Sequence, residues 1–230
     1  MIRIFDEISR CESPEALFEL VADYFQGQGF GGVCYLAPAG PAGPFHMMDR
    51  GMPAEFMDRY RNQGLHGVDP LPGVAFRLGH PERLAELVKQ VPSLNADEEC
   101  FMEVLKNSGL TDALVIPTYG PYGRPGLLAL ANPVHPDLLA EMNRPLASAV
   151  AQQVHMRMEF LQITEPPPGL SPREREIVKW LGKGKSNTDI ATILGLAVPT
   201  VTTHVQRIYA KLRVHDRVSC IARAMTLHYL

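Results

Sequence analysis

Residues Leu170–Val205, LSPREREIVKWLGKGKSNTDIATILGLAVPTVTTHV, contain the strongest signals of secondary structure in the C-terminal part. Ser171 can cap a helix, and Pro172 suits the first helical position because its missing N–H costs nothing there. Glu174 can complete a capping box with Ser171. Apolar residues then recur at helical spacing until the glycines that follow Leu181. These signals predict a first short helix.

Two further helices follow in the same stretch. A second capping start at Ser186 leads into about two helical turns that end at Gly195. A longer helix begins near Val198 and places one apolar stripe toward a core, formed by Val201, Val205, Ile208 and Leu212. This order of helices is the outline of a helix-turn-helix. A fourth amphipathic segment over residues 216–230 completes an all-α, four-helix C-terminal domain.

The outer face of the third helix is polar and almost free of acidic residues. Gln206 can pair with adenine through two hydrogen bonds, and Thr202 offers a hydroxyl and a methyl group to base edges. The cations Arg207, Lys211 and Arg213 are placed to hold phosphates. The alternative is an ordinary solvated helix face. The candidate DNA-binding residues are Thr200, Thr202, Thr203, Gln206, Arg207, Lys211, Lys185 and Ser186.

The distribution of charge divides the chain. From Ser171 onward there are ten Lys or Arg and four Asp or Glu, a net charge of +6, whereas residues 1–170 carry −9. A small basic segment joined to a larger acidic one indicates a polyanion-binding module. Three consecutive prolines in Thr164–Gly169 cannot continue a helix and favour a stiff spacer. We therefore expect domains at 1–162 and 170–230, joined by a Pro-rich linker at 163–169.

Composition indicates a soluble protein. The chain is 46% hydrophobic and 20% charged, its apolar runs are too short for a bilayer, and no signal peptide is evident near Met1. We expect a cytoplasmic protein with no membrane partner. Widely spaced cysteines match neither a disulfide framework nor a metal motif, so no metal or cofactor is expected. They are Cys11, Cys34, Cys100 and Cys220. Buried thiols are the simpler interpretation, and a redox sensor is the alternative.

The N-terminal part mixes helical and strand patterns. Residues 13–25, 53–63, 97–108 and 137–162 have helical periodicity, the last interrupted at Pro145. Residues 30–37, 113–118 and 126–131 are short apolar runs, and the last two are expected to pair as antiparallel strands. Glycines and prolines at 40–44 predict a turn. The fold predicted for this domain is an α+β, αβα sandwich with an antiparallel sheet, which can enclose a small apolar ligand.

The C-terminal sixty residues resemble the DNA-binding domain of LuxR-type regulators. The resemblance implies that the helix near Val198 enters the major groove of a palindromic site in double-stranded DNA, bound by a homodimer, with Thr202 and Gln206 at base-reading positions. Thr202 replaces a residue that is usually long and basic, and Ala197 replaces a capping Ser or Thr. The matching positions are Glu174, Gly184, Ile190, Ala191, Leu194, Gly195, Thr200, Val201, His204, Lys211 and Leu212.

The N-terminal part resembles the acyl-homoserine-lactone-binding domain that often precedes this module. The resemblance rests on the order Phe56, Tyr60, Asp69-Pro70, Gly109 and Ile116-Pro117. It implies that Asp69 accepts a hydrogen bond from the ligand amide and that Tyr60 donates one to the acyl carbonyl. The alternative is that Tyr60 is a half-buried helix residue and that Asp69 begins the turn at Pro70.

The departures from this resemblance concern the lactone ring. Phe56 stands where the family has a tryptophan that donates to the lactone carbonyl, Leu84 where a second tryptophan covers the ring, and Ala113 where a glycine is usual. A buried carbonyl without a donor costs about 1–3 kcal/mol. We expect an altered acyl- or aroyl-type ligand, as in a LuxR solo, or weak lactone binding, or no ligand. The candidate ligand-binding residues are Tyr60, Asp69, Phe56, Leu84 and Ala113.

The sequence favours a ligand-responsive, quorum-sensing transcriptional regulator over two other functions. An enzyme would need a nucleophile motif around Cys34, Cys100 or His46, or a phosphate loop, and neither is found, so no catalytic residue is expected. A phosphorylation-relay regulator shares the DNA-binding domain but needs a receiver domain with alternating strands and helices. Asp6 and Glu7 are acidic, yet that rhythm does not follow. A regulator that needs no ligand remains an alternative. The sequence does not distinguish an activator from a repressor.

Overall fold

The computed structural model describes residues 2–38, 45–120, 124–162, 169–227 and 229–230. Within these ranges the chain forms two compact units, one ending at Gln162 and the other running from Gly169 to Leu230. The predicted turn at 40–44 lies outside the described residues. Of the predicted linker at 163–169, only Gly169 is described. The first unit has a hydrophobic core on each face of its sheet, and the second unit has a core of its own.

The first unit is built on an antiparallel sheet. Among the described residues it has five strands in the order β2-β1-β5-β4-β3. They are β1 (Phe30–Pro38), β2 (Phe45–Arg50), β3 (Glu82–Arg83), β4 (Ala113–Tyr119) and β5 (Pro125–Pro133). Successive side chains of a strand point to opposite faces. Val33 and Tyr35 of β1 accordingly enter one core, while Cys34 and Leu36 contact the other.

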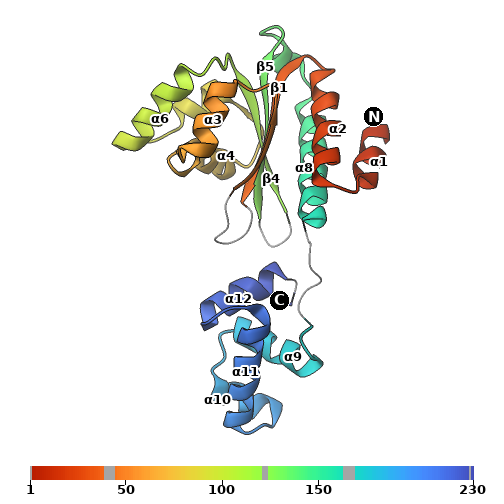
Figure 1. The fold of residues 1–230 in the computed structure, drawn as a ribbon, viewed down its shortest axis with the longest axis vertical. Helices are drawn as coiled ribbons and strands as arrows, with labels where there is room; N and C mark the ends of the chain where they lie inside the picture. The colour runs from red at the N-terminus through yellow and green to blue at the C-terminus, as the bar shows by residue number, and fades with distance from the viewer. Residues whose placement is uncertain (1, 39–44, 121–123, 163–168, 228) are drawn as a thin grey trace. The chain divides into compact units, whose positions relative to one another are not determined.

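Helices cover both faces of the sheet (Figure 1). One face carries α1 (Ile2–Arg10), α2 (Pro14–Gln26) and α8 (Arg144–Leu161). The other carries α3 (Ala54–Asn62), α4 (Leu71–Leu78), α5 (Leu84–Lys89) and α6 (Ala96–Lys106), with a 3-10 turn at Leu65–Gly67. The expected α+β, αβα sandwich is confirmed.

The predicted long helix over residues 137–162 is two helices. The short α7 (Leu138–Glu141) ends before Asn143, whose side chain caps α8. Pro145 lies in the first turn of α8, where its missing N–H breaks no helical bond. The proline therefore starts a helix rather than interrupting one.

The second unit is the predicted four-helix domain. Its helices are α9 (Pro172–Gly182), α10 (Asn187–Leu194), α11 (Val198–Leu212) and α12 (Arg217–Thr226). Capping boxes start α9 and α10, and Gly195 ends α10 in the left-handed conformation. The predicted stripe of α11 is buried in the core. The last helix is shorter than the predicted 216–230, with Asp216 as its cap.

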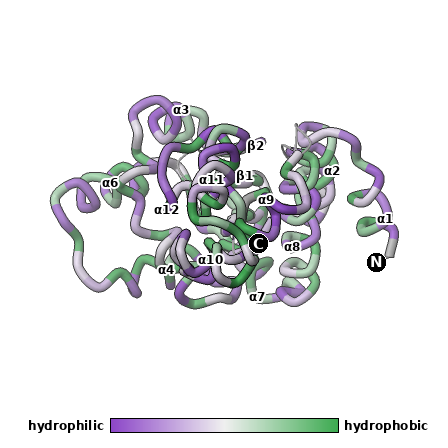
Figure 2. The backbone as a smooth tube through the Cα atoms, turned by 90° about the horizontal axis from the view of Figure 1, so that it is seen from below, coloured by the Kyte–Doolittle hydropathy of each residue, from purple (hydrophilic) through white to green (hydrophobic). Residues whose placement is uncertain are grey.

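Hydropathy alternates along the helices of both units, as expected for elements that bury one face (Figure 2). In the described part of the chain, no helix combines the length and apolarity that crossing a membrane requires.

Candidate ligand cavity and DNA-binding surface

The first unit contains a cavity between the sheet and the layer of α3, α4, α5 and α6. Its volume is about 110 Å³, whereas one water needs only about 10–15 Å³. The wall is almost wholly apolar. From the sheet it is lined by Cys34, Leu36, Met47, Val115, Leu127 and Ala129, and from the helical layer by Met57, Leu71, Phe101 and Leu105, among others.

The structure brings the five candidate ligand-binding residues together in this wall. Phe56 and Tyr60 are four residues apart on α3, so they share a face of the helix. Asp69 precedes α4, Leu84 begins α5, and Ala113 begins β4. Tertiary packing thus collects residues from separate segments around one space.

Tyr60 and Asp69 are the polar pair of the cavity. The Tyr60 hydroxyl donates a 2.9 Å hydrogen bond to Oδ2 of Asp69, and the Leu71 backbone N–H donates one of 2.9 Å to Oδ1. Burial raises the pKa of the Asp69 carboxyl to about 6, although these two hydrogen bonds act in the opposite direction. Burial, together with the Asp69 charge, also raises the pKa of Tyr60, so its hydroxyl stays a donor.

The remaining wall offers little chemistry beyond apolar contact. The Phe56 ring lies 5.8 Å from the Tyr60 ring, centre to centre, and has no hydrogen-bond donor. Cys34 also lines the cavity, but burial raises the pKa of its thiol to about 12. A protonated thiol is a poor nucleophile, so the cavity is suited to binding rather than to covalent chemistry.

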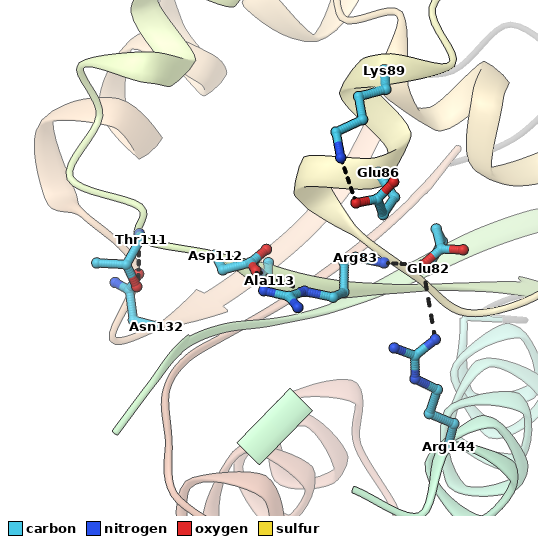
Figure 3. A network of polar contacts seen from close by, with 9 residues as sticks. All are labelled: Glu82, Arg83, Glu86, Lys89, Thr111, Asp112, Ala113, Asn132 and Arg144. Carbon is cyan, nitrogen blue, oxygen red and sulfur yellow. Dashed lines mark hydrogen bonds and ion pairs between the residues drawn. The ribbon is translucent and has the colours of Figure 1, made fainter. Parts of the chain in front are cut away.

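A polar network surrounds Arg83 and Asp112 (Figure 3), which directly precede the cavity-lining residues Leu84 and Ala113. The Arg83 guanidinium donates two hydrogen bonds to Oδ2 of Asp112, joining the edge strand β3 to the start of β4. Asn132 accepts from the Thr111 backbone N–H at 2.9 Å, and its own N–H donates to the Asp112 carbonyl. Since Leu84 and Ala113 directly follow Arg83 and Asp112, the network fixes both positions.

Sequence reasoning missed much of this wall. Met47 lies on β2, which was not predicted, and Met52 and Met57 were not recognised as cavity residues. Methionine is flexible and polarizable, so it fits irregular space without a distinctive spacing in the sequence. No local signal identifies these residues in the sequence, because strand pairing and helix packing determine which side chains line the cavity.

The second unit presents the predicted reading face on α11. Gln206 and Arg207 are exposed, and among the described residues neither side chain has a hydrogen bond or ion pair. The hydroxyls of Thr202 and Thr203 donate to the carbonyls of Val198 and Pro199, one turn earlier.

Three other candidates lie at the starts of α10 and α11. The exposed Thr200 is in the first turn of α11, and the exposed Lys185 lies before α10. Ser186 is the cap of α10, accepting from the Asp189 backbone N–H. The Asn187 amide donates to Thr202 at 3.3 Å, which joins α10 to the reading face and was not predicted.

Lys211 is engaged within the protein. Its ammonium donates a 2.6 Å hydrogen bond to Glu174 Oε2 and one of 3.2 Å to the Gly169 carbonyl. Glu174 is only 3% exposed. Burial alone would raise the pKa of Glu174, but the hydrogen bonds from Lys211 and Ser171 lower it. This ion pair, rather than a phosphate, accounts for the position of Lys211.

No group of side chains suited to a metal ion is found within the described ranges.

The comparisons with known proteins agree with both units. A model of the family "Autoinducer binding domain" matches residues 13–158, and one of "Bacterial regulatory proteins, luxR family" matches residues 168–224. The transcriptional activator protein SolR of Ralstonia nicotianae is 26% identical over 224 residues, covering 94% of this chain and 92% of that protein. The quorum sensing-dependent regulator RpaR of Rhodopseudomonas palustris is 26% identical over 235 residues, covering 98% and 93%.

Solved structures share the fold. "SdiA in complex with octanoyl-rac-glycerol" matches with a TM-score of 0.75 at 18% identity, covering 98% of this chain and 93% of that chain. Escherichia coli SdiA matches with a TM-score of 0.73 at 20% identity, covering 98% and 96%. The N-terminal match lies where a phosphorylation relay would need its receiver domain. The chain belongs to the LuxR family of bacterial transcription regulators, not to an enzyme family, and carries an autoinducer-binding domain before its helix-turn-helix domain.

Proposed function

We propose that this protein is a ligand-responsive regulator that binds a palindromic site in double-stranded DNA as a homodimer, with a small-molecule signal held in the cavity of the first unit. The observation that carries the proposal is the pairing of Tyr60 with Asp69 in an otherwise apolar wall. Such a site has one donor and one acceptor with which to orient a neutral, mostly apolar molecule.

The chemistry of this pair fits an amide. Asp69 can accept a hydrogen bond from an amide N–H, and Tyr60 can donate one to the neighbouring carbonyl. An acyl-homoserine lactone has this group, as do acyl and aroyl amides without a lactone. Phe56 and Leu84 supply no donor for a ring carbonyl, which favours the non-lactone analogues. Among proteins of this fold, SdiA was solved in complex with an octanoyl glycerol, whereas CepR2 of Burkholderia cenocepacia is an N-acylhomoserine lactone dependent factor.

A dimer is supported by the surfaces of α8 and α12. The exposed residues of α8 follow helical spacing in one uncharged stripe, Pro145, Ala149, Gln153, Met156 and Phe160. On α12, Val218 and Met225 are exposed. Two recognition helices are needed because one short helix reads too few bases, and a palindrome presents the same half-site twice.

Ligand binding and DNA binding are then linked. A ligand binds preferentially to one state of the first unit and so increases the population of that state. When that state places the two recognition helices at the spacing of the half-sites, the ligand also raises the affinity of the dimer for the operator. In this scheme the ligand controls DNA binding through the dimer.

Native mass spectrometry of protein purified from its own host tests the proposal. We expect a co-purifying small molecule and a dimer, and we expect the loaded protein to footprint a palindromic promoter site. An empty protein that footprints the same site equally well would support the ligand-independent alternative. A loaded monomer that occupies a single half-site would contradict the dimer.

A further inference from the structure

The recognition helix α11 ends in an unusual backbone conformation. Arg213 follows its last residue with φ 54° and ψ 49°, in the left-handed region. Among the described residues, Asn132 is the other non-glycine with positive φ. Asparagine tolerates this conformation, and the Asn132 side chain is fixed by Thr111. Arg213 has neither explanation.

Elsewhere the chain places glycine at equivalent helix ends. Gly79 ends α4 and Gly195 ends α10, with φ 70° and 64°. At Arg213 the left-handed turn lets the Val214 N–H bond the Tyr209 carbonyl, closing the helix. A glycine would make the same turn without the clash between Cβ and carbonyl that an arginine suffers. Arginine at this position therefore lowers stability, and such local costs often occur at functional sites.

The arginine side chain lines an open groove that continues the reading face. This groove, of about 560 Å³, is lined by Gln206, Tyr209, Ala210, Arg213, Val214 and His215. In the described part of the chain, neither a carboxylate nor a carbonyl bonds the Arg213 guanidinium. Lys211, two residues earlier, is instead held by Glu174. Arg213 is thus the cation at this end of α11 that is available to an outside anion.

The distance between Thr202 and Arg213 along α11 can be compared with the width of the major groove. Arg213 follows Thr202 by eleven residues, about 16 Å along a helix, whereas the major groove is about 12 Å wide. A helix that reads bases near its start therefore reaches the sugar-phosphate backbone at its other end, as recognition helices do.

We propose that Arg213 binds a DNA phosphate in this groove, and that the protein keeps an arginine in a left-handed turn for that contact at a cost in stability. The inference rests on the proposed DNA-binding function. It assigns to Arg213 a favourable effect on DNA affinity and an unfavourable effect on stability.

Arg213→Asn tests the inference, because asparagine accepts the left-handed conformation and removes the charge. The full-length protein is titrated with a fluorescent 30-base-pair duplex of random sequence at several salt concentrations. We expect a loss of about three- to tenfold in affinity at 0.1 M salt and a decrease of about 0.9 in the slope of log K against log salt. The melting temperature should stay the same or rise by a few degrees. Arg213→Lys should retain most of the affinity.

Arg223→Gln is the matched control, since it removes one exposed cation from α12, outside the groove. An equal loss of affinity in Arg223→Gln would overturn the inference, because bulk charge would then explain it. An unchanged slope in Arg213→Asn would also overturn it while leaving DNA binding intact. A wild-type protein with no salt-dependent affinity for the duplex would overturn the proposed function as well.

Discussion

The Tyr60 hydroxyl donates a 2.9 Å hydrogen bond to Oδ2 of Asp69 across an otherwise apolar cavity wall. The donor and the acceptor satisfy each other, so neither is left unpaired in the apolar wall. A ligand amide that bonds to both must loosen or replace this contact. The net gain in free energy is therefore the difference between two sets of hydrogen bonds, and apolar burial contributes most of the affinity.

Asp69→Asn is expected to stabilise the protein above pH 6 while weakening its binding of amides. The folded state keeps the Asp69 proton up to a pKa of about 6, whereas an unfolded chain loses it near pH 4. Between these values the folded state binds more protons, so the free energy of unfolding falls as pH rises. As pH rises from below the unfolded pKa to above the folded pKa, the wild type thus loses about 3 kcal/mol of stability that the asparagine variant keeps.

Thermal unfolding at pH 4 and pH 8 measures this effect. The advantage of Asp69→Asn over wild type should be larger at pH 8. Asp58→Asn, at an exposed carboxylate of the neighbouring α3, is the control and should show no such trend. An advantage that is equal at both pH values would contradict the burial of the Asp69 charge.

Phe56→Trp should create affinity for a lactone. The indole adds an N–H donor to the cavity wall, and one recovered hydrogen bond corresponds to roughly a 10- to 100-fold gain. N-octanoyl-homoserine lactone and N-cyclopentyl octanamide differ only in the ring ester, so they form a matched pair for calorimetry. The wild type should bind the cyclopentyl amide at least as tightly, and the variant should prefer the lactone. An equal gain in affinity for both compounds would mean that the larger indole ring of the variant, and not its N–H donor, was responsible.

Lys211→Met should destabilise the helix-turn-helix domain by about 1–3 kcal/mol, because it leaves the buried Glu174 carboxylate without its cation. In a Glu174→Gln background the same substitution should cost less, since no buried charge remains. Urea unfolding of the four proteins of this double-mutant cycle measures the coupling. Equal costs in the two backgrounds would show that the ion pair is not what Lys211 contributes.

Gln206→Ala should weaken binding to the footprinted operator by about 1–3 kcal/mol and leave binding to random duplex almost unchanged. The Gln206 side chain is exposed and has no hydrogen bond within the described residues, so it does not hold the domain together, and under the proposed function it reads a base. Competition between operator and random DNA separates the two affinities. If both fall equally, Gln206 does not read sequence.

Gly126→Ala should disrupt the core on the other side of the sheet. A Cβ at this position would lie 2.5 Å from His155 Nδ1, the atom that is 2.7 Å from the Tyr35 hydroxyl. A contact this short forces the ring to move and breaks the bond, so the melting temperature should fall by several degrees. Gly67→Ala, with open space around the added methyl group, is the control. Similar melting temperatures for both variants would contradict this packing.

Local signals predicted most of the secondary structure. The capping boxes at Ser171 and Ser186 and the stripe of α11 are contained within a few consecutive residues, so their helices followed from the sequence. The helices α1, α4 and α5 and the strands β2 and β3 were not predicted. All of these elements are short, and packing within the folded unit contributes much of the stability of such short elements.

The class of each domain was predictable from periodicity, caps and charge, because these signals lie within short stretches of the chain. The resemblance to the acyl-homoserine-lactone-binding domain also implied five candidate residues, and all five line the cavity. That these residues line one cavity, that Tyr60 bonds Asp69 and that Lys211 bonds Glu174 became visible only in the folded chain. The physical reason is that each of these contacts joins residues from different elements, whose distance depends on strand register and helix packing rather than on sequence spacing.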